Sequence, residues 1–182
     1  MGLIIIVAVV LAGLYFWYAG IVAKRNRVAE ALAGIDAQLN QRHDLVPNLL
    51  AIAKRYMTHE GDVLEQVTQL RSAVSAASGP AARFAAEQKL DAGLGRLLAV
   101  AENYPALKAD GPMIEAQRGL AEVETNIAAA RRFYNSAVAD LRTATQTFPG
   151  SLLAPLAGAS TSPPFFEAPA EARAPIDAAA HL

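Results

Sequence analysis

The chain has 182 residues, which leaves room for one folded domain beside a membrane segment. Its 16 Lys and Arg residues stand against 17 Asp and Glu residues, and the net charge of −1 argues against a nucleic-acid-binding surface. The sequence contains no cysteine, which excludes disulfides, thiol chemistry and cysteine-ligated zinc.

An uncharged segment near the N-terminus predicts a membrane-spanning helix. Residues 3–22 are 20 residues without a charge or a proline. A helix of that length rises about 30 Å, the thickness of the hydrocarbon core of a bilayer. A cleaved signal peptide is the alternative, but no basic residue precedes the apolar run, which exceeds the usual length of about 7–15 residues. We therefore expect residues 1–23 to form an uncleaved anchor in the lipid bilayer.

The residues at the end of this segment predict its orientation. An aromatic cluster that includes Trp17 and Tyr18 lies near its C-terminal end, and such rings favour the headgroup boundary. Lys24, Arg25 and Arg27 follow directly. Positive charge on this flank alone indicates that the flank stays in the cytoplasm. We expect a single-pass protein with its N-terminus outside and its domain in the cytoplasm.

Residues 24–148 carry apolar side chains at helical spacing. From Val28 to Tyr56 these residues are three and four positions apart, which is the repeat of coiled coils. We call the positions of this repeat the seam. Arg42 occupies a seam position where an apolar residue is expected. Pro47 lies inside the pattern and predicts a kink or a restart of the helix.

Break signals divide the rest of this domain into further helices. The seam resumes at residues 63–74, and a Ser-Gly-Pro sequence at 78–80 ends it. We expect a helix over about 81–103, a loop over 106–112, and a long final helix over about 113–147. The predicted fold class is all-α: a transmembrane helix followed by an antiparallel, coiled-coil-like bundle of long helices.

The final helix carries polar residues in its seam. One seam position in three successive heptads is held by Gln117, Glu124 and Arg131. Such groups are costly in a helical core unless they are hydrogen-bonded or paired. The first helix supplies the candidate partners Asp36, Arg42 and Asp44. We hypothesise a buried polar ladder of these six residues.

Two pairings are expected within the polar ladder: Arg42 with Glu124, and Arg131 with Asp36 or Asp44. A structural interpretation makes the ladder a device that fixes the register of the helices. A functional interpretation makes it a site for a ligand or an ion.

From residue 149 the composition changes to proline and alanine. Residues 149–182 contain six prolines and ten alanines, and we expect a tail that is mobile or draped over the bundle. Its strong apolar residues are Leu152, Leu153, Leu156, Phe165 and Phe166. These side chains either dock on the domain or form a recognition segment for a partner.

Several motifs resemble the LemA family. Residues 35–49, with the sequence IDAQLNQRHDLVPNL, are similar to the signature of that family. The resemblance continues through residues 102–108, the seam residues Gln117, Glu124 and Arg131, and residues 165–167. It implies an N-terminal anchor, a cytoplasmic antiparallel helical bundle and no established catalytic activity.

The same resemblance implies a place in bacteria. Family members include a protein of the magnetosome membrane, and others are encoded near a membrane zinc metalloprotease. These associations favour the bacterial inner membrane and a role in membrane organisation or quality control.

The sequence offers no motif for catalysis. The histidines are His43, His59 and His181, and the His-Glu sequence at residue 59 lacks the second histidine that a helical zinc site needs. No glycine-rich phosphate loop or partnered serine nucleophile is recognisable. We expect no enzyme, no cofactor and no metal.

We therefore expect a non-catalytic, homo-oligomeric scaffold that organises the cytoplasmic face of the membrane. Confinement in a membrane raises the effective concentration, so weak lateral contacts suffice for assembly. One alternative is an adaptor or accessory factor for a membrane protease or transporter. Another is a receptor for a small polar ligand at the polar ladder.

Overall fold

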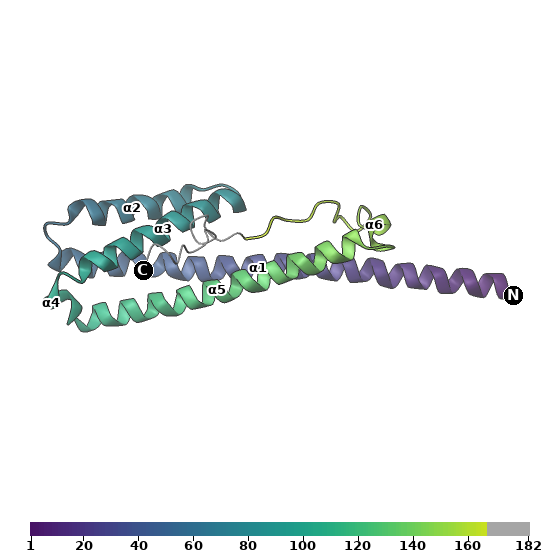
Figure 1. Cartoon of the computed structure of the whole chain (residues 1–182), viewed down its shortest axis with the longest axis horizontal. Coiled ribbons are helices and arrows are strands. Elements are labelled where there is room, and N and C mark those ends of the chain that lie inside the picture. Colours follow the sequence, from purple (N-terminus) through teal and green to yellow (C-terminus); the bar gives the residue numbers. More distant parts are fainter. Residues whose placement is uncertain (167–182) are drawn as a thin grey trace, which may run out of the picture. The chain divides into compact units, whose positions relative to one another are not determined.

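The computed structural model describes residues 1–166, apart from the side chain of Pro80. These residues form helices and connections, with no strand in the described part of the chain. In chain order the helices are α1 (Gly2–Tyr56), α2 (Gly61–Ala76), α3 (Pro80–Ala101), α4 (Pro105–Lys108), α5 (Gly111–Gln146) and α6 (Gly150–Leu153) (Figure 1). The predicted all-α class with a long, apolar N-terminal helix is confirmed, while the antiparallel coiled-coil arrangement stays a prediction.

The chain divides into two compact units. The bundle unit comprises residues 35–129, and the anchor unit comprises residues 1–34 together with residues 130–166. Helices α1 and α5 each contribute residues to both units. The tail beyond residue 166, with His181, lies outside the described residues.

The core of the bundle unit is made by the predicted seam. Helix α1 contributes Val46, Leu49 and Ala53, all buried. Helices α2 and α3 pack side by side (Figure 1) and bury the remaining seam residues of this region, among them Val63, Val67, Val74, Leu90, Leu94 and Leu97. Burial of these aliphatic side chains supplies the main favourable free energy of the unit.

Pro47 does not end α1, which continues unbroken to Tyr56. A proline inside a helix has no N–H to donate, so the carbonyl four residues earlier loses its partner. That carbonyl belongs to His43, and the side chain of Arg71 donates to it through Nε at 3.3 Å. The predicted restart of the helix is therefore wrong, and a side-chain donor from α2 takes the place of the missing N–H, while the predicted kink stays a prediction.

This substitute hydrogen bond predicts a coupling between Arg71 and Pro47. We expect Arg71→Ala to lower the free energy of unfolding by about 1 kcal/mol, because the His43 carbonyl loses its donor. In a Pro47→Ala background the backbone N–H returns, and the same Arg71→Ala change is expected to cost less. Denaturant unfolding of the four proteins gives the coupling energy. Equal costs in both backgrounds would contradict the assignment.

The anchor unit begins with an apolar stretch that the rest of the chain leaves largely exposed and contacts near Trp17. Residues 2–20 of α1 are exposed throughout, and burial starts at Ile21. An 18-residue window within α1 has a mean hydropathy of 2.3, so this helix is long and apolar enough to span a membrane. Behind it, Ile21 and Val28 of α1 and Val138 and Leu141 of α5 are buried in the unit.

Two local predictions need correction. Residues 106–112 were expected to be a loop, but Pro105 opens the short helix α4, since a proline fits the first turn of a helix. Phe148, whose spacing continues the seam of the final helix, lies beyond the end of α5 and is 78% exposed. The buried seam of α5 thus ends before Phe148.

Candidate functional site

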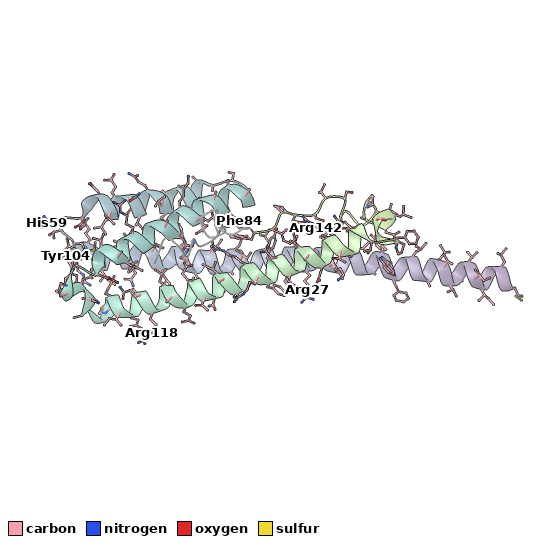
Figure 2. All side chains as sticks on the ribbon, in the orientation of Figure 1. Arg27, His59, Phe84, Tyr104, Arg118 and Arg142 are labelled. Atoms are coloured by element: carbon pink, nitrogen blue, oxygen red, sulfur yellow. The ribbon has the colours of Figure 1, made fainter. Side chains whose placement is uncertain are left out.

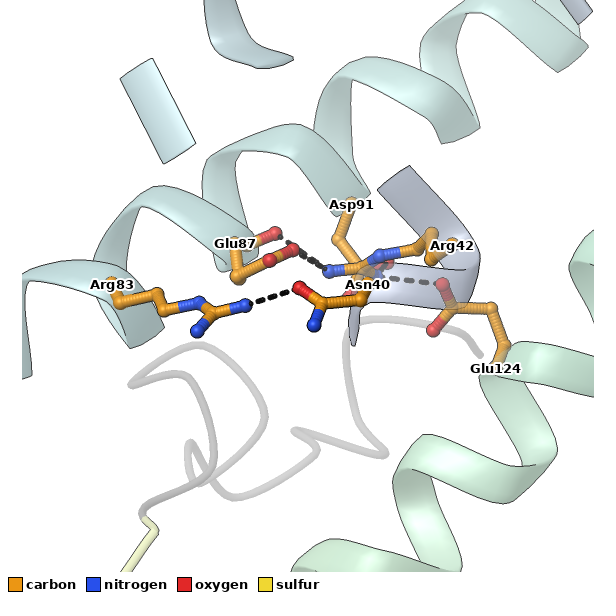
Figure 3. Close-up of polar contacts among 6 residues, drawn as sticks. All are labelled: Asn40, Arg42, Arg83, Glu87, Asp91 and Glu124. Atoms are coloured by element: carbon orange, nitrogen blue, oxygen red, sulfur yellow. Dashed lines mark hydrogen bonds and ion pairs between the residues drawn. The ribbon is translucent and has the colours of Figure 1, made fainter. Parts of the chain in front are cut away.

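Arg42 of α1 lies at the centre of a cluster of carboxylates, drawn in Figure 3. Its Nη1 donates to Asp91 Oδ1 of α3 at 2.5 Å and to Glu124 Oε1 of α5 at 2.6 Å. Its Nη2 donates to the carboxylate and to the backbone carbonyl of Glu87 on α3. We call Arg42, Glu87, Asp91 and Glu124 the Arg42 cluster. One guanidinium thereby ties three helices together.

The Arg42 cluster is buried at Arg42 and Glu87, reaches solvent at Asp91 and Glu124, and carries excess negative charge. The side chains of Arg42 and Glu87 are 0% and 1% exposed, whereas Asp91 and Glu124 are about one third exposed. Three carboxylates face one guanidinium, so two of the negative charges have no cation among the four groups. The buried atoms Arg42 Nε and Glu87 Oε1 have no hydrogen-bond partner in the described structure.

This arrangement shifts the pKa of two groups in the same direction. Burial lowers the pKa of Arg42, but Asp91, Glu124 and Glu87 together outweigh that effect and raise it. The pKa of Glu124 is raised, because loss of hydration and the neighbouring carboxylate of Asp91 outweigh the attraction of Arg42. Arg42 therefore stays charged, while Glu124 gains a proton more readily than an ordinary glutamate does.

The raised pKa of Glu124 predicts a pH dependence of stability. Above its ordinary value of 4.5, the unfolded chain releases this proton while the folded chain still holds it. The contribution of Glu124 to the free energy of unfolding therefore falls as pH rises through the raised pKa. We expect a Glu124→Gln variant to lose less stability than the wild type between pH 4.5 and neutrality, measured by denaturant unfolding.

Asp110 provides a control of opposite sign. Tyr56 Oη donates to its Oδ2 at 2.6 Å, and this bond lowers the pKa of Asp110 below 3.8. Its stabilising contribution is present above that pH and is lost as pH falls, so Asp110→Asn alters only the acid limb of the stability curve.

For Glu124, the contradicting outcome is that the wild-type and Glu124→Gln curves of unfolding free energy against pH stay parallel above pH 4.5.

The structure brings together one predicted pair, Arg42 with Glu124, and adds two partners that the sequence reasoning missed. Glu87 and Asp91 were not among the predicted ladder residues. The signal for Glu87 was present, because counting the seam of α3 backward from Leu90 by three positions arrives at it. Asp91 follows Leu90 directly and lies one turn after Glu87, so both reach the same guanidinium.

The other ladder residues have different surroundings. Asp36 pairs with Arg83 of α3 at 3.1 Å, and Arg83 also donates to Asn40 at 2.8 Å. Asp44 is exposed, and Gln117 is half-buried beside a hollow of about 300 Å³. Asp36 thus has another partner than the predicted ones, and Asp44 is not buried as predicted. The predicted pairing of Arg131 with Asp36 or Asp44 stays a prediction.

A second polar contact in the bundle unit involves Tyr104. Tyr104, labelled in Figure 2, donates from its hydroxyl to Glu60 at 3.2 Å, and loss of hydration raises its pKa. His59, also labelled, is exposed next to Glu60. Within residues 1–166, no group of three or more His, Asp or Glu side chains is placed to hold a metal ion. The Tyr104 contact thus links the chain that follows α3 to the residue that precedes α2.

In the anchor unit, arginines hold the aromatic residues of the tail. The guanidinium carbon of Arg131 lies 4.4 Å from the ring centre of Phe166, and that of Arg142 (labelled in Figure 2) lies 4.6 Å from the ring centre of Phe165. Asn135 exchanges two hydrogen bonds with the backbone of Phe166, at 2.8 and 3.0 Å. The two phenylalanines, predicted as docked or partner-binding, are docked on α5.

The membrane-proximal end of α1 contacts the chain that follows α5. Arg25 donates from Nη1 to the carbonyl of Ala157 at 3.0 Å, and Arg27 lies over the ring of Phe133 at 5.3 Å. Trp17 and Lys24 line an apolar groove of about 460 Å³. Tyr18 is 37% exposed. The residues predicted to mark the membrane boundary thus lie within one structured region.

Comparison with protein families matches residues 31–178 to the LemA family. The match covers most of the chain and includes every residue of the Arg42 cluster. Comparison with curated proteins finds no significant similarity to any of them. The chain belongs to the LemA family, as its motifs predicted.

Proposed function

We propose that this member of the LemA family is a non-catalytic scaffold that α1 anchors in the bacterial inner membrane and that associates with copies of itself. The observation that carries the proposal is the uncovered apolar stretch of α1. Residues 2–20 are exposed over the whole circumference of the helix, and so many apolar side chains facing water would be strongly unfavourable. A lipid bilayer is the environment that removes this penalty.

The charges that follow the apolar stretch support a cytoplasmic position of the domain. Lys24, Arg25 and Arg27 form a basic flank directly after the stretch. Because the chain has no cysteine, single-cysteine variants report topology without background. We expect an Ala33→Cys variant in intact cells to be protected from a membrane-impermeant maleimide. Rapid labelling would place the domain outside and overturn the orientation.

The Arg42 cluster supports a structural role over the receptor alternative. Both guanidinium nitrogens Nη1 and Nη2 are already engaged by carboxylates of the chain itself, and the side chain is fully buried. A polar ligand would have to displace these partners and open three packed helices. The excess negative charge would also repel an anion. We therefore assign the Arg42 cluster to holding the bundle in register.

Two features favour self-association. At Gly13 and Gly20 of α1 an added Cβ would meet nothing within 4 Å, so neighbouring anchors have room to approach closely there. Alanines lie exposed on the bundle unit, for example Ala73, Ala76, Ala128 and Ala129. Restriction to the membrane plane raises the effective concentration of such weak contacts.

The mass of the detergent-extracted protein tests the scaffold. We expect one homogeneous particle of several copies by light scattering and single-particle imaging, with each subunit retaining its N-terminal residues in an intact-mass measurement. Monomers at high protein concentration would exclude a scaffold and leave the adaptor alternative. A subunit mass that lacks the apolar stretch would instead indicate a cleaved signal peptide.

A further inference from the structure

Three large apolar side chains after α5 are exposed in the anchor unit. Phe148, Leu152 and Leu156 are 78%, 68% and 73% exposed. They are four residues apart on and around the short helix α6 (Gly150–Leu153), which is followed by further turns. We call these three residues the boundary face. Single exposed leucines are common, but three large exposed apolar side chains within residues 148–156 indicate a surface that is covered in the working protein.

The segment that carries the boundary face has no charge. Residues 143–166 are 24 residues without Asp, Glu, Lys, Arg or His. Surface segments of soluble domains normally interrupt such runs with charged residues for solubility. The composition therefore favours an apolar or interfacial environment over water.

Contacts with α1 place this segment at one level of the anchor. A Cβ on Gly150 would lie 3.2 Å from Nε1 of Trp17, and Arg25 donates to the carbonyl of Ala157. Residues 150–157 of the segment therefore lie beside the part of α1 between Trp17 and Arg25, a length of about 12 Å along the helix axis. This part leads from the aromatic end of the apolar stretch to its basic flank.

Close packing fixes the segment at that level. A Cβ on Gly150 would lie 1.9 Å from the backbone oxygen of Ala144, so only glycine permits this approach. Gly158 has a φ of 66°, a conformation that favours glycine, and an added Cβ would lie 2.6 Å from Nη1 of Arg25. The boundary face is thus presented by a defined turn held against α1.

We propose that the boundary face enters the headgroup region of the same membrane that α1 spans, as a second, surface-bound contact of the anchor unit with lipid. The inference rests on the proposed membrane anchoring by α1. Once α1 crosses the bilayer, Trp17 and Arg25 bracket the headgroup layer. Apolar side chains fixed beside them gain free energy by entering the acyl boundary, as amphipathic interfacial segments do.

The experiment uses the full chain in lipid vesicles. A Leu152→Cys variant carries a single environment-sensitive fluorophore, and the vesicles contain phosphatidylcholine and phosphatidylglycerol with or without nitroxide quenchers on the acyl chains. An Ala33→Cys variant is the matched control, because Ala33 is exposed on α1 beyond the basic flank. We expect quenching at Leu152 to exceed that at Ala33 roughly twofold or more, since interfacial segments bury their apolar face about 5–10 Å deep.

A second variant tests whether the boundary face holds the fluorophore in place. Adding Phe148→Ser and Leu156→Ser to the labelled Leu152→Cys chain should reduce its quenching toward the control. Equal quenching at Leu152 and Ala33 in the parent variants would overturn the inference. So would disulfide cross-linking of the unlabelled Leu152→Cys variant between two chains, which would assign the face to a second copy.

Vesicle flotation of the same samples separates this inference from the proposed anchor. Protein that floats with the vesicles while Leu152 stays unquenched retains the anchor and refutes the surface contact. Protein that does not float refutes the anchor itself.

Discussion

Replacing Arg42 with methionine is expected to lower the free energy of unfolding by about 3–5 kcal/mol, because the change leaves a buried carboxylate without its cation. Glu87 is 1% exposed and has Arg42 as its ion-pair partner. Asp91 and Glu124 would then repel each other and Glu87 without a positive charge between them. Thermal and denaturant unfolding of the detergent-solubilised full chain, followed by circular dichroism, measures the loss.

Arg83→Met is the matched control. Arg83 is also an arginine at a position of the seam repeat, on α3. Its side chain is 28% exposed and pairs with Asp36, which is itself 40% exposed. Ion pairs at such positions contribute at most about 1 kcal/mol, so we expect a small effect. If both substitutions cost the same, the Arg42 cluster has no special role in stability.

A rescue distinguishes the cost of an unpaired charge from the loss of a unique packing arrangement. In Arg42→Met with Glu87→Leu, the two fully buried polar side chains become apolar, and Asp91 and Glu124 keep access to water. We expect most of the lost stability to return, because buried ion pairs are often replaceable by apolar residues. If the rescued protein is stable but forms a particle of a different mass, the Arg42 cluster controls the register of the helices.

The sequence predicted the helical core well because burial follows the seam. Val28, Leu39 and Val46 in α1 and Leu120 and Ile127 in α5 lie at the seam spacing, and all are buried. The repeat is a local property of a helix and needs no knowledge of its neighbours. For the same reason, Arg42 was recognised as a buried charge, and Glu124 was identified as a partner across the core.

The sequence could not predict which carboxylates share one guanidinium. Asp91 lies outside the seam, and its contact depends on how α3 is rotated against α1. Asp36 was assigned to the polar ladder, yet Arg83 reaches it from the start of α3. The donor that replaces the Pro47 N–H, Arg71, is likewise a tertiary feature. Spacing predicts which face of a helix is buried but leaves the pairing across that face undetermined.

Phe148 shows a different limit. Its spacing continues the seam of α5, but the helix ends at Gln146, and the chain then turns back along α1. A seam residue beyond a helix end no longer faces the helix core. Its exposure is a consequence of where α5 stops, and it joins Leu152 and Leu156 on the boundary face.

Two arginines in the middle of the apolar stretch are expected to abolish stable insertion of the protein in the membrane. The stretch at 3–22 contains twelve Leu, Ile, Val and Phe residues, which together contribute about −4 to −7 kcal/mol on the insertion scale. Val10→Arg with Leu11→Arg adds about 5–7 kcal/mol near the helix centre, enough to cancel that gain. Both side chains are more than half exposed, so no protein contact is disturbed.

Alkaline carbonate extraction of isolated membranes reads out the result, because it releases proteins bound only at the surface. The control places the same two charges at Ala29 and Ala33, which are exposed on the same helix beyond the basic flank, and this variant should stay in the pellet. Retention of the Val10→Arg, Leu11→Arg protein in the pellet would refute the anchor.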